Sequence, residues 1–160
     1  MKAATFCVVG KTESGKSTWV KNTLKGVPLK NQFIFDFQNE YDNSSGIKEF
    51  DSFVSHATRR KNSVIVFEEA TVYITGNTIQ KGVKNLLVSK SSHHNNNVLI
   101  FVFHAVRKIP VNLFEMTDYI VLFETNDRAD EIRKFRNPIL TARMLQLKNE
   151  PKKGPIIIRL

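Results

Sequence analysis

The sequence contains a single cysteine and no long hydrophobic segment, and both shortages restrict the class of protein. With Cys7 alone among 160 residues, no disulfide framework can form, and a reducing compartment is the simplest expectation. No apolar run approaches the roughly 20 residues of a membrane-spanning helix. The N-terminus has no apolar signal segment distinct from the first predicted strand. We therefore expect a protein with no membrane span.

Acidic residues are scarce relative to basic ones. The chain has 15 aspartates and glutamates against 24 lysines and arginines, which gives a formal net charge of +9. The basic residues recur in short groups: Arg59, Arg60 and Lys61; Lys81, Lys84 and Lys90; Arg133, Lys134 and Arg136; and Lys148, Lys152 and Lys153. This balance favours a polyanionic partner such as nucleic acid, but only weakly, because runs of charge are usually solvated faces.

The rest of the composition is that of an ordinary folded domain. Hydrophobic residues make up 41% of the chain and charged residues 24%, which argues against disorder. A chain of 160 residues is large enough to bury one sizeable core. No internal repeat, low-complexity tract or linker divides it. We therefore predict a single domain over residues 1–160.

A glycine-rich segment follows the first predicted strand. It has the pattern G-x-x-x-x-G-K-S and consists of Gly10, Lys11, Thr12, Glu13, Ser14, Gly15, Lys16 and Ser17, with Thr18 behind it. The apolar residues 5–9 predict a buried strand before it, and residues 17–24 predict the start of a helix. A strand, a loop of this pattern and a helix form the phosphate-binding loop of nucleoside triphosphatases.

The chemistry of such a loop assigns a task to each residue type. Glycines bring backbone N–H groups close to the phosphates, and the helix N-terminus adds a favourable dipole. Lys16 would reach the β- and γ-phosphates, and the Ser17 hydroxyl would ligate Mg²⁺. We therefore predict that Gly10, the segment from Thr12 to Ser17, and Thr18 bind a nucleotide. ATP is preferred by elimination, because no N-K-x-D-like tetrapeptide for guanine recognition follows the fourth strand.

Apolar runs and periodic segments alternate along the rest of the chain. We predict strands at residues 33–37, 64–67, 98–103 and 119–123, and helices at 50–57, 79–91, 124–136 and 138–147. Residues 71–77 are expected to form a loop, and residues 155–160 a last strand or a partner-binding tail. Strands that are apolar throughout and alternate with helices indicate an α/β fold, with a mostly parallel sheet covered on both faces.

Polar residues stand at the carboxyl ends of these strands, where α/β sheets bind ligands. Asp36, the pair Glu68 and Glu69, and His104 each follow an apolar strand. One carboxylate of the pair can hold a magnesium-bound water while the other orients or deprotonates the attacking water. His104 could contact the γ-phosphate. The alternatives are a solvated acidic pair and a structural histidine, but a phosphate-binding loop upstream favours the catalytic interpretation.

Histidine and arginine are two further residue types that can take part in such a site. His93 and His94 are adjacent and lack the cysteine and acidic neighbours of a metal site, so we expect no metal there. An arginine often stabilises the transition state from a neighbouring subunit. Arg107, Arg128 and Arg133 are open candidates for that task.

The order of these motifs resembles the FtsK–HerA superfamily of DNA-pumping ATPases. The resemblance spans about residues 3–125 and includes the segment Asp36 to Tyr41 after the second strand. The small size is similar to the genome-packaging ATPases of membrane-containing and archaeal viruses and to the Zot-like ATPases of filamentous phages. The resemblance leaves residues 126–160 unassigned.

The resemblance implies a RecA-like P-loop core whose fourth strand lies between the first and the third. It implies a homo-oligomeric ring, usually a hexamer, with ATP between neighbours and double-stranded DNA in the channel. Glu68 takes the Mg²⁺ position usually held by Asp, Glu69 that of the catalytic base, and His104 the sensor position usually held by Gln. His93 lies near a position where relatives often carry Arg. A capsid or portal component is a further implied partner, in the host cytoplasm or the virion.

We therefore predict an ATP-hydrolysing motor that translocates or packages DNA. Its channel contacts would come from residues 71–77 and from Lys81 and Lys84, although an exposed helix face explains these lysines equally well. One alternative is a nucleotide-gated assembly or secretion factor of a phage, which would bind ATP without turnover. Another is a small kinase, against which the chain shows no Arg-rich lid segment.

Overall fold

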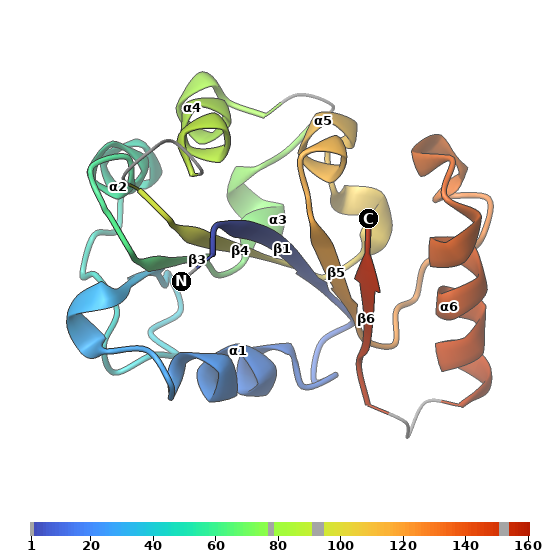
Figure 1. The fold of residues 1–160 in the computed structure, drawn as a ribbon. Helices are drawn as coiled ribbons and strands as arrows, with labels where there is room; N and C mark the ends of the chain where they lie inside the picture. The colour runs from blue at the N-terminus through green and yellow to red at the C-terminus, as the bar shows by residue number, and fades with distance from the viewer. Residues whose placement is uncertain (1, 77–78, 91–94, 151–153) are drawn as a thin grey trace.

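The computed structural model describes residues 2–76, 79–90, 95–150 and 154–160. It contains a six-stranded sheet in the order β2-β3-β4-β1-β5-β6 (Figure 1). The strands are β1 Ala4–Val9, β2 Gln32–Phe35, β3 Val64–Phe67, β4 Val98–Phe103, β5 Tyr119–Leu122 and β6 Ile156–Arg159. The α-helices are α1 Lys16–Leu24, α2 Phe50–Ala57, α3 Ala70–Tyr73, α4 Lys81–Ser89, α5 Val111–Glu115 and α6 Pro138–Asn149. Short 3-10 turns are η1 Leu29–Asn31, η2 Val106–Lys108 and η3 Arg133–Phe135.

The sheet confirms the predicted α/β class and the RecA-like strand order. Strands β1 to β5 pair in parallel, and β4 lies between β1 and β3 as expected. Val9 lies opposite Phe103, and Phe67 lies opposite both Phe35 and Phe101. Because the register is parallel, the chain leaves β1, β2, β3 and β4 at one common edge, which places the predicted polar residues on one rim.

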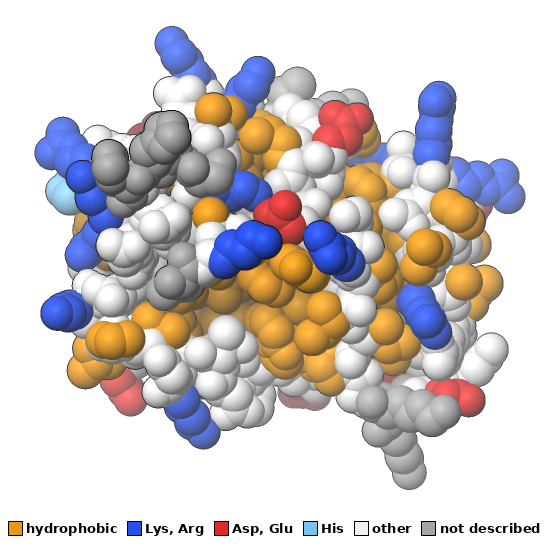
Figure 2. Space-filling view, viewed as in Figure 1, with side chains coloured by type: hydrophobic (Ala, Val, Ile, Leu, Met, Phe, Trp, Pro, Cys, Tyr) orange, Lys and Arg blue, Asp and Glu red, His pale blue; other side chains and the backbone are white. Residues whose placement is uncertain are grey.

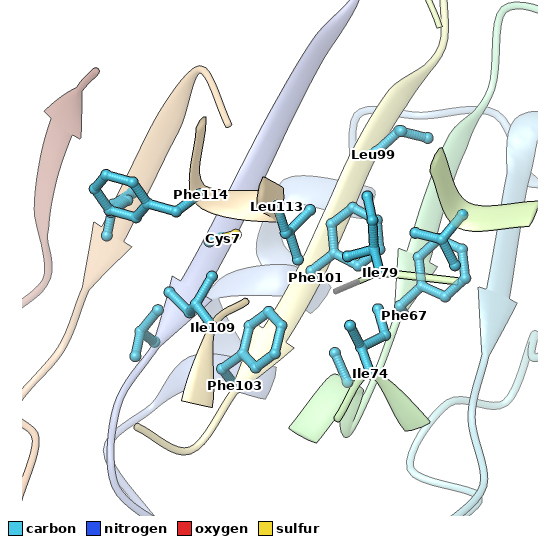
Figure 3. Close-up of a cluster of buried hydrophobic side chains, with 14 of the residues drawn as sticks. Cys7, Phe67, Ile74, Ile79, Leu99, Phe101, Phe103, Ile109, Leu113 and Phe114 are labelled. Carbon is cyan, nitrogen blue, oxygen red and sulfur yellow. The ribbon is translucent and has the colours of Figure 1, made fainter. Parts of the chain in front are cut away.

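The two faces of the sheet are covered unequally. Helix α1 lies alone on one side in Figure 1, whereas α2, α4 and α5 lie on the other. The larger core is on the side of α2, α4 and α5, where aromatic side chains stack between strands and helices (Figure 3). The rings of Phe67 and Phe101 are 4.6 Å apart, and those of Phe33 and Phe53 are 4.5 Å apart. Burying a Phe side chain stabilises the fold by about 1.5–3 kcal/mol, so this aromatic layer holds β2, β3 and β4 in place.

Residues 71–77 are not simply a loop, as the sequence had suggested. A one-turn helix, α3, begins immediately after Glu69, whose φ of 54° is left-handed. Ile74 N donates to Ala70 O at 2.8 Å, and both side chains are buried. Burial of these two residues anchors the turn below the sheet rim. Asn77 lies outside the described residues.

The predicted helix over residues 124–136 is wrong. Only the short turn η3 is helical there, and the segment instead crosses the sheet rim in an irregular path. Its charged residues bond to other parts of the chain: Asp127 accepts from Val106 N, and Lys134 Nζ donates to Arg107 O. These long-range contacts take the place of the helix that was expected from the sequence. Tertiary contacts outweighed local propensity.

The C-terminal prediction resolves in favour of a strand. Residues 156–159 form β6, which pairs antiparallel with β5 and places Ile156 opposite Leu122. The preceding helix α6 begins at Pro138, as predicted, with the Asn137 side chain accepting from Leu140 N at 2.9 Å. Leu140, Met144 and Leu147 of α6 are buried in the larger core. The last third of the chain is therefore integral to the domain.

The face shown in Figure 2 carries its positive charge in a dispersed form. Lysine and arginine side chains lie around the outline and also near the centre of this face, above an area of hydrophobic side chains. Dispersed charge fits the interpretation of solvated faces better than a single nucleic-acid track on this face. None of the helices in the described part of the chain combines the length and the apolar character that crossing a membrane requires.

Candidate functional site

The loop between β1 and α1 has the backbone that phosphate binding requires. Gly15 has a φ of 98°, which favours glycine. At Gly10 a Cβ would lie 2.5 Å from Ser14 Oγ and 2.6 Å from Phe123 Cβ, so any side chain there would collide with the loop. Glu13 also has a left-handed φ of 62°. The two glycines of the motif are therefore needed for close approach and for a left-handed turn, respectively.

The loop surrounds a cavity of about 310 Å³ lined by Thr12, Glu13, Ser14, Gly15, Lys16, Ser17, Thr18 and Glu40. All of the loop residues predicted to bind nucleotide, apart from Gly10, face this space. Ser14 Oγ is buried and has no hydrogen-bond partner among the described residues. It could therefore donate a hydrogen bond to a phosphate oxygen. The donors present therefore fit a polyphosphate.

Lys16 is the cation of this cavity. Its side chain is only 7% exposed, and Nζ donates to Lys11 O at 2.8 Å. Burial lowers the pKa of Lys16, while the charges of Glu69, Glu68 and Glu40 act in the opposite direction. A buried ammonium with donors to spare is suited to the β- and γ-phosphates of a triphosphate.

Glu68 lies directly beside the loop. It follows β3, is 2% exposed, and Oε1 accepts from Ser17 Oγ at 3.0 Å. Burial raises the pKa of Glu68 to about 7, against the opposing effect of its hydrogen bond from Ser17. In phosphate sites Mg²⁺ binds oxygen ligands such as a carboxylate and a serine hydroxyl, and phosphate and water complete its coordination. Glu68 is such a carboxylate, and its charged form gains little from its buried surroundings. Ser17 and Glu68 would hold that cation.

Glu69 turns away from Glu68 to a different partner. Its Oε2 lies 2.5 Å from His104 Nε2, and His104 N donates to Thr71 Oγ1 at 3.1 Å. The left-handed backbone at Glu69 produces this divergence, because the strand has already ended. The two adjacent acids thus have separate environments, which suits the separate roles predicted for them. The structure brings His104 to Glu69, a contact that sequence reasoning had not anticipated.

Two residues near the cavity were not predicted as site residues. Glu40 lines it directly, and Tyr41 donates its hydroxyl to Glu68 Oε2 at 3.3 Å. Asp36 positions this segment, because its Oδ2 accepts from Tyr41 N at 2.8 Å. The available signal was their place just after a strand that ends at the ligand-binding rim.

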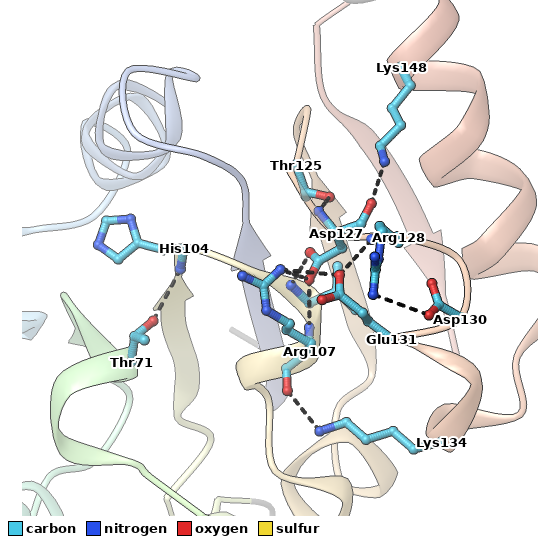
Figure 4. Close-up of polar contacts among 11 residues, drawn as sticks. Thr71, His104, Arg107, Thr125, Asp127, Arg128, Asp130, Glu131, Lys134 and Lys148 are labelled. Atoms are coloured by element: carbon cyan, nitrogen blue, oxygen red, sulfur yellow. Dashed lines mark hydrogen bonds and ion pairs between the residues drawn. The ribbon is translucent and has the colours of Figure 1, made fainter.

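The arginine candidates differ in how firmly they are held (Figure 4). Arg107 Nη1 donates to Asp127 Oδ1 at 2.9 Å and lies 3.4 Å from Glu131 Oε2. Arg128 is largely exposed and lies 3.4 Å from Asp130. Arg133 is exposed at the start of η3. Arg107 is thus committed to contacts within its own chain, which leaves Arg128 and Arg133 freer to reach a second molecule. His93 and His94 lie outside the described residues.

These features define the class of fold. A buried strand, a phosphate-binding loop and a helix, with an acid-bearing strand two places away and a polar residue ending the strand between them, constitute a RecA-like P-loop NTPase fold. The cavity of the loop, with the buried Lys16 and the unpaired Ser14 hydroxyl, suits a polyphosphate. Neither a family model nor a curated protein sequence matches the chain.

Solved structures do match it. The genome packaging NTPase B204 from Sulfolobus turreted icosahedral virus 2, in complex with AMP, superposes with a TM-score of 0.76 at 18% identity, over 98% of this chain and 92% of that one. The complex of the same protein with ATP-γS gives 0.69 at 16% identity, over 98% and 92%. B204 from Sulfolobus turreted icosahedral virus, described as a DNA-packaging ATPase, gives 0.68 at 18% identity, over 98% and 97%. At this identity the likeness establishes the fold.

Proposed function

We propose that this chain is an ATP-hydrolysing motor that packages or translocates DNA, with viral genome packaging as its task. The observation that carries the proposal is the convergence of Lys16, Ser17, Glu68, Glu69 and His104 on one rim of a RecA-like sheet. The similar structures are described as genome-packaging NTPases, and the chain aligns with nearly their whole length. The motor would act as a homo-oligomeric ring on double-stranded DNA, in the host cytoplasm or on the virion.

The site residues divide the chemistry among them. Lys16 and the loop N–H groups bind the phosphates of ATP, and Mg²⁺ held by Ser17 and Glu68 would neutralise charge on them. Glu69 orients the attacking water and accepts its proton as the oxygen bonds to the γ-phosphorus and the bond to the β–γ bridging oxygen breaks. His104 holds Glu69 in place through the 2.5 Å contact. Glu69 thus acts as the base and His104 as its positioning partner.

A groove next to this site suits a nucleic-acid backbone. Arg107, Lys108 and Lys134 line a cavity of about 230 Å³ together with Thr71, Ile74, Thr75 and Gly76. No acid in the described part of the chain lines the cavity, and Lys108 and Lys134 supply positive charge to it, which favours phosphodiester groups. Arg107 contributes less charge, because its guanidinium is already paired with Asp127 and Glu131. Thr71 belongs to α3, which begins directly after Glu69, and its hydroxyl accepts a hydrogen bond from His104 N. A ligand in this groove would therefore contact a helix that is joined to both Glu69 and His104. We place the DNA contact in this groove in preference to Lys81 and Lys84, which lie exposed on α4.

The test is phosphate release from Mg·ATP with and without double-stranded DNA. Wild type should hydrolyse ATP faster with DNA, and both Lys16→Ala and Glu69→Gln should abolish turnover. Lys108→Ala should reduce the stimulation by DNA while leaving the DNA-free rate unchanged. Tight ATP binding without turnover under any condition would contradict the motor and favour a gated assembly factor. Transfer of phosphate to an added nucleotide would favour a kinase.

A further inference from the structure

Tyr41 is a firmly anchored side chain that contacts the predicted cation site. Its ring is 6% exposed and belongs to the core on the α1 side of the sheet. Its backbone N donates to Asp36 Oδ2 at 2.8 Å, and Lys48 Nζ donates to Asp36 O at 3.1 Å. Lys21 Nζ lies 5.1 Å from the ring centroid. Backbone and ring are both fixed, so the position of the hydroxyl is determined by the fold.

The Tyr41 hydroxyl and the Ser17 hydroxyl hold opposite ends of the same carboxylate. Tyr41 Oη donates to Glu68 Oε2 at 3.3 Å, while Ser17 Oγ donates to Oε1 at 3.0 Å. Burial raises the pKa of Tyr41, and the negative charge of Glu68 raises it further. The phenol therefore stays protonated and remains a hydrogen-bond donor. With one donor on each oxygen, the plane of the Glu68 carboxylate is fixed.

The glutamate at this position needs such a second anchor. Glutamate has one more rotatable bond than aspartate, so its carboxylate sweeps a larger volume unless another group holds it. Groups that orient a metal-binding carboxylate by hydrogen bonding affect metal affinity by about 10–100-fold. Among the described residues, Ser17 and Tyr41 are the two whose side chains donate hydrogen bonds to Glu68.

We propose that Tyr41 is a positioning residue that orients Glu68 for the cation and thereby sets the affinity of the site for Mg²⁺·nucleotide. The inference rests on the proposed function only in taking Glu68 as a cation ligand. It requires neither DNA binding nor a ring. A purely structural Tyr41 would contribute through its ring, which Tyr41→Phe retains.

The experiment measures binding of ATP-γS to the full chain over a range of Mg²⁺ concentrations and in EDTA, by titration calorimetry. Tyr41→Phe should raise the half-saturating Mg²⁺ concentration about tenfold and leave binding in EDTA and the melting temperature unchanged. Tyr119→Phe is the matched control, because the Tyr119 ring stacks on Phe6 at 4.9 Å, away from the loop. A half-saturating Mg²⁺ concentration within twofold of wild type would overturn the inference.

A second variant separates orientation from packing. The shorter side chain of Glu68→Asp draws its carboxylate back from the Tyr41 hydroxyl, so adding Tyr41→Phe to it should cause no further loss of Mg²⁺ affinity. An equal loss in both backgrounds would show that Tyr41 acts through something other than Glu68. If wild type shows Mg²⁺-dependent binding but no DNA-stimulated turnover, the motor fails while the Tyr41 result stands. If wild type binds ATP-γS without any dependence on Mg²⁺, the Tyr41 inference itself is overturned.

Discussion

Two buried carboxylates lie at the same rim of the sheet, and their surroundings differ. Asp127 is 0% exposed and accepts from Val106 N, Arg107 N and the Arg107 guanidinium. Glu68 is 2% exposed and has two neutral hydroxyls as donors, with a pKa raised to about 7 by burial. The negative charge of Asp127 is balanced by the Arg107 guanidinium. The charge of Glu68 has no such partner among its hydrogen-bond donors, as expected of a carboxylate whose cation arrives with the ligand.

The partners of a buried acid distinguish a structural role, proposed for Asp127, from a functional role, proposed for Glu68. The cluster around Asp127 joins two parts of the chain to the segment after β5. Lys134 donates to Arg107 O in the turn after β4, and Lys148 of α6 donates to Asp127 O. In the cluster around Glu68, by contrast, Ser17 lines the cavity of the phosphate-binding loop. Substitutions should therefore change stability at the first and catalysis at the second.

The largest effect is expected at Glu69, the proposed base. Glu69→Gln should lower kcat about 1,000-fold, because the proton acceptor is lost while the shape is kept. The matched substitution Glu131→Gln, in the Asp127 cluster, should leave kcat within twofold. Steady-state phosphate release measures both. Equal loss in the two variants would remove the distinction between the clusters.

Asp127→Asn should destabilise the fold by about 3 kcal/mol, since an amide leaves the Arg107 guanidinium without its buried carboxylate. Equilibrium urea unfolding measures this free energy. ATP-γS binding by the folded protein should persist. A change below 1 kcal/mol, within the range of a surface ion pair, would contradict the structural assignment.

Glu68→Gln should stabilise the protein at pH 8 when Mg²⁺ and nucleotide are absent. The pKa of Glu68 rises from 4.5 to about 7 on folding. The wild-type penalty is therefore absent below pH 4.5, grows as pH rises to 7, and stays constant above it. The variant gains up to about 3 kcal/mol at pH 8 and little at pH 5. Urea unfolding at the two pH values checks this, and a pH-independent difference would contradict it.

The smallest effect is expected at His104. His104→Gln keeps a donor within reach of Glu69 and should reduce kcat less than tenfold, whereas His104→Ala should reduce it further. The ratio of the two rates measures how much orientation of Glu69 contributes. Identical rates in both variants would show that the contact with Glu69 does not matter.

Much of the fold and part of the site could be predicted from the sequence. The glycine-rich loop and the acids after the third strand are local patterns, and the parallel sheet brings them together with His104. The contact of Tyr41 with Glu68 and that of Asp127 with Arg107 could not be predicted. The residues of the first pair are 27 positions apart in the sequence, and those of the second are 20 positions apart. The helix predicted over residues 124–136 is wrong for the same reason. The charged side chains of this segment make long-range contacts, which no local periodicity reveals.

The most direct test of the account is thermal unfolding with ATP-γS in Mg²⁺ compared with ATP-γS in EDTA. Wild type and Asp127→Asn should both melt at a higher temperature in Mg²⁺, because their cation site is intact. Glu68→Gln should lose that Mg²⁺-dependent increase. An increase retained in Glu68→Gln, or lost in Asp127→Asn instead, would contradict the claim that Glu68 is the carboxylate reserved for the cation.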